Sequence, residues 1–348
     1  MEELPVITNA GNGNSAGMHD TEPERIISEI RRRRAGVVGL QFPEGLKKSG
    51  FEIARMIEKE TGAKVFISAN PCFGACDLDE RLIGFCDVLF HFGHSQLEKT
   101  SLEEKVCFIE TRSGADIEKA VRASTSLLKG PGVGLVTTVQ HAHMLPEAAR
   151  LLSEAGFSPV IGKGDNRVVY PGQVLGCNFS SARDASGDCD EFLFIGSGEF
   201  HPIGISLSTG RRVICADPYM STAREITPRR YLMKRSAVLG NARDAQTFGI
   251  LISTKNGQCR MKLADALKEK AEAHGKEAFL IAADLVTPDQ LLSFRADAFI
   301  NTACPRLAVD DSGRFPAPVL TPQEFEIIVG EREWEDLVMD EIIEGGRE

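Results

Sequence analysis

Four of the nine cysteines lie in short segments rich in glycine, alanine or proline that follow apolar stretches of the chain. They are Cys72, Cys76, Cys177 and Cys304. A thiolate is a soft ligand that suits zinc and iron–sulfur clusters, and small neighbouring residues let a bulky inorganic group approach the backbone. The odd number of cysteines and the absence of a secretory signal pattern argue against a disulfide framework. We therefore expect a cytoplasmic protein in which a few thiols bind a metal or a cluster.

The elements that must position these thiols follow a repeated order of strand, loop and helix. Three apolar runs, each followed by an amphipathic helical pattern, predict first strands at Val37–Gln41, Val133–Thr137 and Phe248–Ser253. The predicted second strands are Lys64–Ser68, Pro159–Gly162 and Ala278–Ala282, and the predicted third strands are Val88–Phe92, Glu191–Ile195 and Ala298–Asn301. Strands that alternate with helices of this length indicate parallel sheets.

The predicted third strands recur about 105 residues apart, and each follows an aspartate: Asp87, Asp190 or Asp297. We therefore predict an α/β fold of three similar domains, each a small parallel sheet flanked by helices, arranged around a pseudo-threefold axis. The predicted division is a disordered lead-in at 1–22, then 23–129 with Cys76, 130–243 with Cys177, and 244–348 with Cys304. The last domain should end in an acidic C-terminal helix over Glu331–Ile343.

Ligands of parallel α/β sheets gather at the carboxyl ends of the strands. Cys72, Cys76 and Cys177 follow predicted second strands, and Cys304 follows a predicted third strand. Around a threefold axis, three such loops would point to one centre, where three thiolates could hold a four-iron cluster and leave one iron open. Two alternatives stay open. Each thiol could be an ordinary core residue, or Cys72 and Cys76 could be half of a zinc site, although no second close pair is found elsewhere in the sequence.

The net charge of the chain and the absence of several known sequence motifs argue against several classes of function. The formal net charge of −10 argues against broad binding to nucleic acid or anionic membranes, and no apolar run is long enough to span a bilayer. The sequence has no phosphate-binding loop, no dinucleotide fingerprint after a strand and no HExxH motif. We therefore expect a bound cofactor to carry the chemistry, with the protein supplying position and electrostatics.

The segments CFGACD, YPGQVLGCNF and NTACPRLAVDD resemble the three cluster motifs of the archaeal diphthamide synthase family. The resemblance runs from about Ile27 to Val329. It implies a homodimer of three-domain α/β subunits, in which Cys76, Cys177 and Cys304 bind one [4Fe–4S] cluster. Cys72 falls outside this ligand set, and we interpret it as a residue of the core or of the surroundings of the cluster.

The resemblance also implies the reaction. The open iron would bind S-adenosylmethionine, whose 3-amino-3-carboxypropyl group would be transferred by a radical reaction to the imidazole C2 of a histidine in translation elongation factor 2. This is the first step of diphthamide formation, and it needs an electron donor. Glycine-containing loops at strand ends are candidates for holding S-adenosylmethionine, because glycine allows close backbone approach. The candidate residues are Gly93, His94, Ser95, Gly198, Phe200, His201, Thr254, Gly257 and Gln258.

Two other hypotheses belong to different classes. Quinolinate synthase is another three-domain cluster enzyme with one cysteine per domain and an open iron, so a dehydratase of that kind is the alternative enzyme. The chain could also be a binding module of three domains that a metal stabilises without catalysis. Binding of S-adenosylmethionine would separate the transferase from both.

Overall fold

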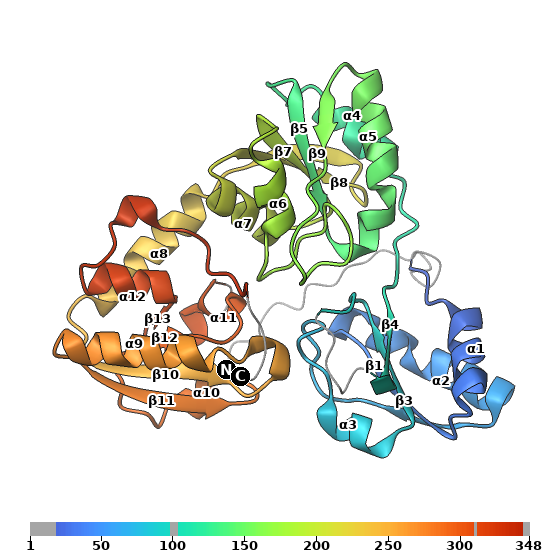
Figure 1. Cartoon of the computed structure of the whole chain (residues 1–348), viewed down its shortest axis with the longest axis horizontal. Coiled ribbons are helices and arrows are strands. Elements are labelled where there is room, and N and C mark those ends of the chain that lie inside the picture. The colour runs from blue at the N-terminus through green and yellow to red at the C-terminus, as the bar shows by residue number, and fades with distance from the viewer. Residues whose placement is uncertain (1–18, 98–103, 310–311, 344–348) are drawn as a thin grey trace, which may run out of the picture.

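The chain forms three lobes, each built on its own β-sheet, and the lobes lie at the corners of a triangle (Figure 1). The computed structural model describes residues 19–97, 104–309 and 312–343. Alternation of strands and helices in the sequence leads to this fold, because neighbouring parallel strands need a crossover connection, usually a helix. The predicted α/β fold with three sheet regions flanked by helices is confirmed.

Each lobe combines four or five strands with helices on the faces of its sheet. The first lobe holds α1 (Pro23–Arg33), β1 (Val37–Gln41), α2 (Gly50–Thr61), β2 (Lys64–Ile67), α3 (Glu80–Phe85), β3 (Val88–Phe92) and β4 (Val106–Ile109). The second holds α4 (Glu118–Ser124), β5 (Gly132–Thr137), α5 (Leu145–Glu154), β6 (Ser158–Val160), α6 (Ser180–Ala185), β7 (Glu191–Ile195), α7 (Phe200–Thr209), β8 (Arg212–Asp217) and β9 (Thr222–Ile226). The third holds α8 (Arg229–Ala242), β10 (Thr247–Ser253), α9 (Met261–Ala273), β11 (Glu277–Ala283), α10 (Pro288–Leu291), β12 (Ala298–Asn301), α11 (Arg306–Val309), β13 (Val319–Leu320) and α12 (Pro322–Ile328).

The three sheets share one strand order, with the first strand of each lobe between the second and the third. The orders are β2-β1-β3-β4, β6-β5-β7-β8 and β11-β10-β12-β13, and all these neighbours are parallel. The second sheet differs from the expected parallel form because β9 pairs antiparallel with β8 at its edge. Only a short turn separates these two strands, and a short turn can join antiparallel neighbours but not parallel ones.

The aspartate before each third strand has the same structural task in all three lobes. Asp87 accepts hydrogen bonds from two backbone N–H groups where β1 begins, and Asp297 does the same where β10 begins. Asp190 accepts one from the first residue of β5, Gly132. The carboxylate satisfies strand-end donors that the sheet leaves unpaired. The repeated aspartate in the sequence therefore marks a repeated structural unit.

The helix that precedes each first strand packs on the sheet that follows it. α4 contributes Ala120 and Val121 to the core of the second lobe, and the end of α8 contributes Ala242 to the core of the third. The boundaries expected after residues 129 and 243 placed both helices with the preceding lobe. The apolar face of each helix explains the difference, because it can be buried only against the sheet beside it.

The expected acidic C-terminal helix over Glu331–Ile343 does not form. The described part of this segment has only a short 3-10 turn at Trp334–Asp336 and continues as irregular chain to residue 343. Met339, Asp340 and Ile342 are buried against the body of the protein. These tertiary contacts, including an ion pair between Asp340 and Arg260, override the helical pattern of the sequence.

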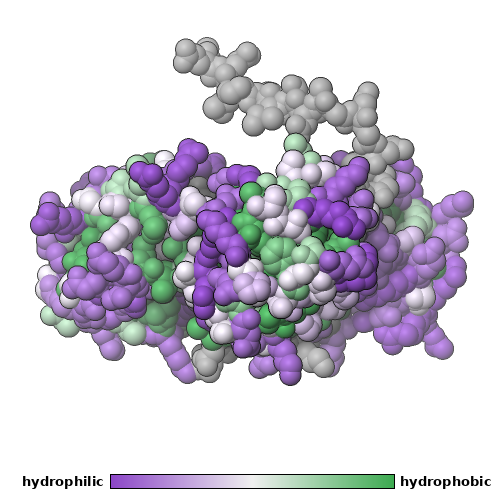
Figure 2. Space-filling model, turned by 90° about the horizontal axis from the view of Figure 1, so that it is seen from above, coloured by the Kyte–Doolittle hydropathy of each residue, from purple (hydrophilic) through white to green (hydrophobic). Residues whose placement is uncertain are grey.

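The expected lead-in at 1–22 lies mostly outside the described residues. Its last four residues are described, and His19 forms an isolated antiparallel bridge with Ser113, in the connection between β4 and α4. The face seen in Figure 2 is largely hydrophilic, with hydrophobic residues gathered in narrower areas between the hydrophilic ones. Among the described residues, no helix has the length and apolar character needed to cross a membrane.

Candidate functional site

Three thiols, one from each lobe, lie in loops that follow strands. Cys76 lies in the loop after β2, Cys177 in the loop after β6, and Cys304 shortly after β12. All three are free thiols and partly buried. We call Cys76, Cys177 and Cys304 the interlobe thiol centre. The expectation that loops from three sheets bring these residues together agrees with this arrangement, and their role as ligands stays a prediction.

The three thiols are close enough to change one another's pKa. Burial raises the pKa of Cys177 to about 12, and the Cys76 thiol adds to the rise. Burial also raises the pKa of Cys304 to about 12, with further contributions from Cys76 and Cys177. The pKa of Cys76 is raised by burial as well. Three neighbouring thiols that resist ionisation suit a positively charged inorganic group, which would stabilise all three thiolates at once.

The loop after β10 closes the interlobe thiol centre from the third lobe. Gln258 Nε2 donates a hydrogen bond to Cys76 Sγ over 3.2 Å. Gly257 lies so close to Cys76 that a Cβ atom at this glycine would fall 2.5 Å from the cysteine Cβ. Lys255 forms an ion pair of 2.7 Å with Asp77, next to Cys76 in the chain. The first and third lobes therefore meet at Cys76 through several specific contacts.

Two arginines favour the thiolate form of Cys177. Arg167 comes from the glycine-rich loop of the second lobe, is 1% exposed, and donates a hydrogen bond to the Gly257 carbonyl over 3.2 Å. Arg167 and Arg260 both act to lower the pKa of Cys177, although burial outweighs them. The backbone carbonyl of Cys177 also accepts a hydrogen bond of 2.7 Å from Ile342 of the C-terminal tail. Charge and backbone contacts thus hold this thiol from two lobes.

The predicted cofactor loop of the second lobe lies beside Arg306 of the third. The Arg306 guanidinium carbon lies 4.7 Å from the centre of the Phe200 ring. Burial lowers the pKa of His201 to about 4, and the nearby charge of Arg306 contributes to the shift. Arg306 also favours the thiolate of Cys304. Gly198 adopts a left-handed φ of 83°, which glycine accepts without strain.

The predicted cofactor loop of the first lobe makes different contacts. Gly93 accepts a hydrogen bond of 2.6 Å from Gln140 Nε2 through its carbonyl. Ser95 Oγ accepts one of 2.7 Å from Gln173 Nε2. His94 instead lies in a cluster within its own lobe. Gly93 and Ser95 therefore join the first lobe to the second.

Among the predicted residues of the third lobe, Gly257 and Gln258 contact Cys76, whereas Thr254 is exposed. The Thr254 backbone N–H donates a hydrogen bond of 3.0 Å to the Ala283 carbonyl, which continues the ladder between β10 and β11. Contact of any of the nine residues with S-adenosylmethionine stays a prediction.

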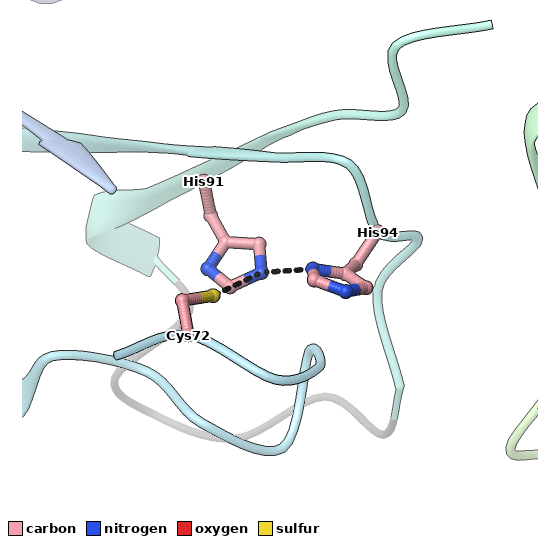
Figure 3. Close-up of side chains that lie close together, drawn as sticks. All are labelled: Cys72, His91 and His94. Atoms are coloured by element: carbon pink, nitrogen blue, oxygen red, sulfur yellow. Dashed lines mark hydrogen bonds between the residues drawn. The ribbon is translucent and has the colours of Figure 1, made fainter. Parts of the chain in front are cut away.

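Cys72 also has a specific place, with neighbours that differ from those of the interlobe thiol centre. Figure 3 shows Cys72, His91 and His94 pointing toward one another. Cys72 Sγ lies 4.0 Å from His91 Nε2, which lies 2.9 Å from His94 Nδ1. Burial raises the pKa of Cys72 to about 12, lowers that of His91 well below its usual value, and lowers that of His94 to about 4. We call these three residues the first-lobe Cys–His cluster.

Sequence reasoning missed the arginines around the thiols, Arg167, Arg260 and Arg306. A weak signal was present, because Arg167 precedes Cys177 in the same long loop and Arg306 follows Cys304 by two residues. Positive charge is what clustered thiolates need, so arginines in cysteine-bearing loops could have been selected. Nothing in the sequence pointed to Arg260, which approaches through its contacts with the C-terminal tail.

The chemistry open to the interlobe thiol centre follows from its donor set. Three thiols with flanking arginines, and glycine next to one of them, fit a soft and bulky inorganic group such as an iron–sulfur cluster. Three protein ligands on a four-iron cluster leave one iron for another ligand.

Comparisons with known proteins assign the family. The family model for diphthamide synthesis proteins matches residues 42–338. A 2-(3-amino-3-carboxypropyl)histidine synthase from Pyrococcus horikoshii is 39% identical, over 95% of this chain and 96% of that protein. This chain belongs to the diphthamide synthesis protein family.

Other members of the family agree in sequence and in fold. The 2-(3-amino-3-carboxypropyl)histidine synthase of Methanocaldococcus jannaschii is 28% identical over 90% of each protein. The crystal structure of Dph2 from Pyrococcus horikoshii with a 4Fe-4S cluster matches with a TM-score of 0.88 at 37% identity, covering 95% of this chain and 96% of that one. The resemblance seen in the three cysteine motifs, and the prediction that the chain is an enzyme of this family, are confirmed.

Proposed function

We propose that this protein is a 2-(3-amino-3-carboxypropyl)histidine synthase that modifies translation elongation factor 2. It would transfer the 3-amino-3-carboxypropyl group of S-adenosylmethionine to the imidazole C2 of one histidine. The observation that carries the proposal is the meeting of three free thiols from three lobes in a family member. The Pyrococcus horikoshii relative, whose structure contains a 4Fe-4S cluster, supports it further.

Cys76, Cys177 and Cys304 would hold a [4Fe–4S] cluster. When bound, the cluster would supply an electron for cleavage of the sulfur–Cγ bond of S-adenosylmethionine and an open iron for its methionine part. The chain's own residues would tune this site. Gln258 would keep its hydrogen bond to Cys76 Sγ, and hydrogen bonds to ligand sulfurs are one means by which proteins set cluster potentials.

Charge around the centre would serve both the cluster and the cosubstrate. Arg167, Arg260 and Arg306 offset the negative charge of three thiolates, since each acts on a thiol of the centre. Among the nine predicted cofactor residues, Gly257, Gln258, Phe200 and His201 have the best support as contacts of S-adenosylmethionine, because they lie against Cys76 or Arg306. Gly93, His94, Ser95, Gly198 and Thr254 have weaker support.

The partners follow from the same proposal. Elongation factor 2 is the protein substrate, and an electron donor must reduce the cluster; neither nucleic acid nor a membrane is required. The protein would work in the cytoplasm as a homodimer. Edge strand β11 supports self-association, because it exposes Phe279 (59%) and Leu280 (41%) beside unpaired backbone groups. The family match weighs against a quinolinate synthase-like dehydratase and against a non-catalytic module.

The test uses anaerobically purified protein and three variants, Cys76→Ala, Cys177→Ala and Cys304→Ala. Cys215→Ala is the control, because this thiol is equally free but lies in the core of the second lobe. Iron and sulfide counts, and EPR after dithionite, should show a reducible four-iron cluster in the wild type and the control and at least tenfold less iron in the three variants.

Activity is measured with S-adenosylmethionine labelled in its carboxypropyl carbons and with elongation factor 2 from the same organism. Label should appear on one histidine only with wild type and control. Iron retained without these thiols would exclude them as ligands. A clean cluster with no transfer of label would overturn the proposed reaction while leaving the cluster site intact.

A further inference from the structure

The first-lobe Cys–His cluster brings three potential metal ligands together from two segments. Cys72 comes from the loop after β2, His91 from within β3, and His94 from the turn after β3 (Figure 3). Cys72 Sγ and one nitrogen of each imidazole all lie within 4.8 Å of one another. The parallel pairing of β1 with both β2 and β3 places the two following loops at the same edge of the sheet, on either side of β1, so the arrangement is set by the fold of one lobe.

A neighbouring glutamine fixes which nitrogen of His91 faces the cluster. Gln41 Nε2 donates to the Asp77 carbonyl over 2.7 Å, and Gln41 Oε1 accepts from the Asp79 N–H over 3.2 Å. The amide orientation is therefore determined by its own partners. Since Gln41 Oε1 is an acceptor and lies 2.9 Å from His91 Nδ1, that nitrogen must carry the proton.

The neutral tautomer of His91 then has its lone pair on Nε2, aimed at Cys72 and His94. A histidine whose far nitrogen donates to a fixed acceptor is the usual form of a metal-bound histidine, because the second bond sets ring orientation and raises ligand basicity. Two potential donors, the Cys72 thiol and His94 Nδ1, compete for this single lone pair. If these side chains only formed hydrogen bonds in the core, one of the two donors would be enough to satisfy the lone pair of His91 Nε2.

The distances are close to those of a tetrahedral zinc site. With bonds of about 2.0 Å to nitrogen and about 2.3 Å to sulfur, tetrahedral ligands lie about 3.3 Å (N to N) and about 3.5 Å (N to S) apart. The observed separations are 2.9 Å between His91 Nε2 and His94 Nδ1, and 4.0 Å between Cys72 Sγ and His91 Nε2. These two separations differ from the tetrahedral values by about 0.4–0.5 Å, within reach of small side-chain rotations, and the third pair, Cys72 Sγ and a nitrogen of His94, lies within 4.8 Å. Cys72 and His91 are buried, whereas His94 is partly exposed and leaves a path for an ion to enter.

We propose that Cys72, His91 and His94 bind one zinc ion, separate from the interlobe thiol centre. Two nitrogens and one sulfur form a borderline-soft donor set that suits zinc, and the fourth position would be open to water. On binding, the thiol S–H bond breaks as the sulfur–zinc bond forms, and the proton leaves to solvent. The Nδ1 proton of His94 moves through solvent to Nε2, so the ring stays neutral.

The bound ion would have a structural consequence. Cys72 and Cys76 belong to one loop, and zinc would tie the beginning of that loop to β3. The loop that presents Cys76 would then be held at both ends, by zinc at Cys72 and by the ion pair between Asp77 and Lys255. The ion would thereby order one arm of the interlobe thiol centre without contributing a ligand to it.

The test separates this site from the interlobe thiol centre by using two forms of the full-length chain. In protein with its cluster assembled, zinc is counted by mass spectrometry after removal of loosely bound metal with a chelator. We expect about one zinc per chain in the wild type and in Cys86→Ser, a control that alters another buried thiol of the same lobe. Cys72→Ser and His91→Asn should retain at least tenfold less.

The second form is the triple variant Cys76→Ala, Cys177→Ala, Cys304→Ala, which cannot assemble the proposed cluster. Cobalt(II) added to this protein should give one equivalent of tetrahedral complex with a thiolate-to-cobalt absorption band, and adding Cys72→Ser should abolish the band. Circular dichroism checks that each variant folds. No cobalt binding, or a band that survives Cys72→Ser, would overturn the proposal. Because this form lacks the cluster ligands, the outcome is independent of the proposed transferase reaction.

Discussion

Cys72 and Cys76 are only four residues apart in one loop, but they face different centres. Cys72 turns into the first lobe toward His91, whereas Cys76 turns outward to Gln258 of the third lobe. Both thiols have a raised pKa because both are buried, so burial does not tell them apart. Their neighbours do: two imidazoles around one, and an amide, arginines and other thiols around the other.

The two centres also differ in how much of the molecule they require. The first-lobe Cys–His cluster depends on residues between Gln41 and His94, all within one sheet and its loops. The interlobe thiol centre depends on contacts from Cys76 to Ile342, across all three lobes. A local centre should survive changes in lobe packing, whereas a centre built between lobes should fail when any lobe shifts.

The largest expected difference between the centres comes from Gly257→Ala. The new Cβ would lie 2.5 Å from Cys76 Cβ and 2.8 Å from its Cα, so the backbone that carries Cys76 must move. Overpacking of this kind costs about 1–3 kcal/mol, which corresponds to about five- to 150-fold weaker retention of a bound group. We expect iron content to fall by about that factor, measured after anaerobic reconstitution, while zinc content stays constant.

Gly240→Ala is the matched control for this substitution. Gly240 lies in α8, where a Cβ meets no atom within 4 Å among the described residues, and alanine should favour the helix by about 1 kcal/mol. Its iron content should equal that of the wild type. Full iron retention in Gly257→Ala would mean that the close contact with Cys76 relaxes at little cost, and the contrast between the two centres would lose its main support.

Asp340→Ala should produce a smaller difference between the two centres, because it reaches the interlobe thiol centre only through the C-terminal tail that this residue anchors. Asp340 is 2% exposed and pairs with Arg260 over 2.7 Å, so the substitution leaves a mostly buried cation without its carboxylate. Loss of one partner of a buried pair costs about 3–5 kcal/mol, and the carbonyl acceptors that Arg260 keeps place the cost near the lower end, about 3 kcal/mol. Denaturant unfolding of the cluster-free protein measures it.

The same variant should affect the two centres unequally. The tail binds the Cys177 carbonyl through Ile342, so a loosened tail should weaken iron retention and leave zinc retention unchanged. Asp336→Ala, in the exposed part of the tail, is the control and should change neither. Equal loss of both metals in Asp340→Ala would show that the first-lobe Cys–His cluster is coupled to the rest of the molecule after all.

The sequence revealed the interlobe thiol centre for a physical reason. Parallel strands direct their following loops to one edge of each sheet, so cysteines in strand-end loops of three repeats can meet at one centre, even though Cys304 follows a third strand and the other two follow second strands. The repeat itself was visible because Asp87, Asp190 and Asp297 perform the same backbone bonding in each lobe. These features depend on local patterns, and local patterns can be recognised in a single sequence.

Other features could not be predicted because they depend on partners distant in the sequence. The tail at 337–343 was expected to be helical, but its burial is decided by Arg260, some 80 residues earlier. The first-lobe Cys–His cluster was missed because His91 lies inside a strand whose other residues are core, and Cys72 was interpreted as packing or surroundings of the cluster. The His91-x2-His94 spacing next to a strand end, together with a cysteine in the neighbouring loop, is the signal that could have revealed it.

The smallest expected effect concerns pH and distinguishes two histidines that follow equivalent strands, His94 after β3 and His201 at the start of α7 after β7. Burial and Arg306 lower the pKa of His201 from 6.5 to about 4 in the folded state. The unfolded chain therefore takes up the proton first, so the stabilising contribution is complete above pH 6.5 and is lost as the pH falls toward 4. Since the ring is partly exposed, we expect the free energy of unfolding to fall by about 1–2 kcal/mol over this interval.

His201→Phe, which keeps the stack on Phe194, should reduce this loss of unfolding free energy between pH 6.5 and 4. It should leave zinc retention at His94 unchanged. An identical pH profile in the variant would show that His201 is protonated equally in both states, and a loss of zinc would show that the two loops are not independent.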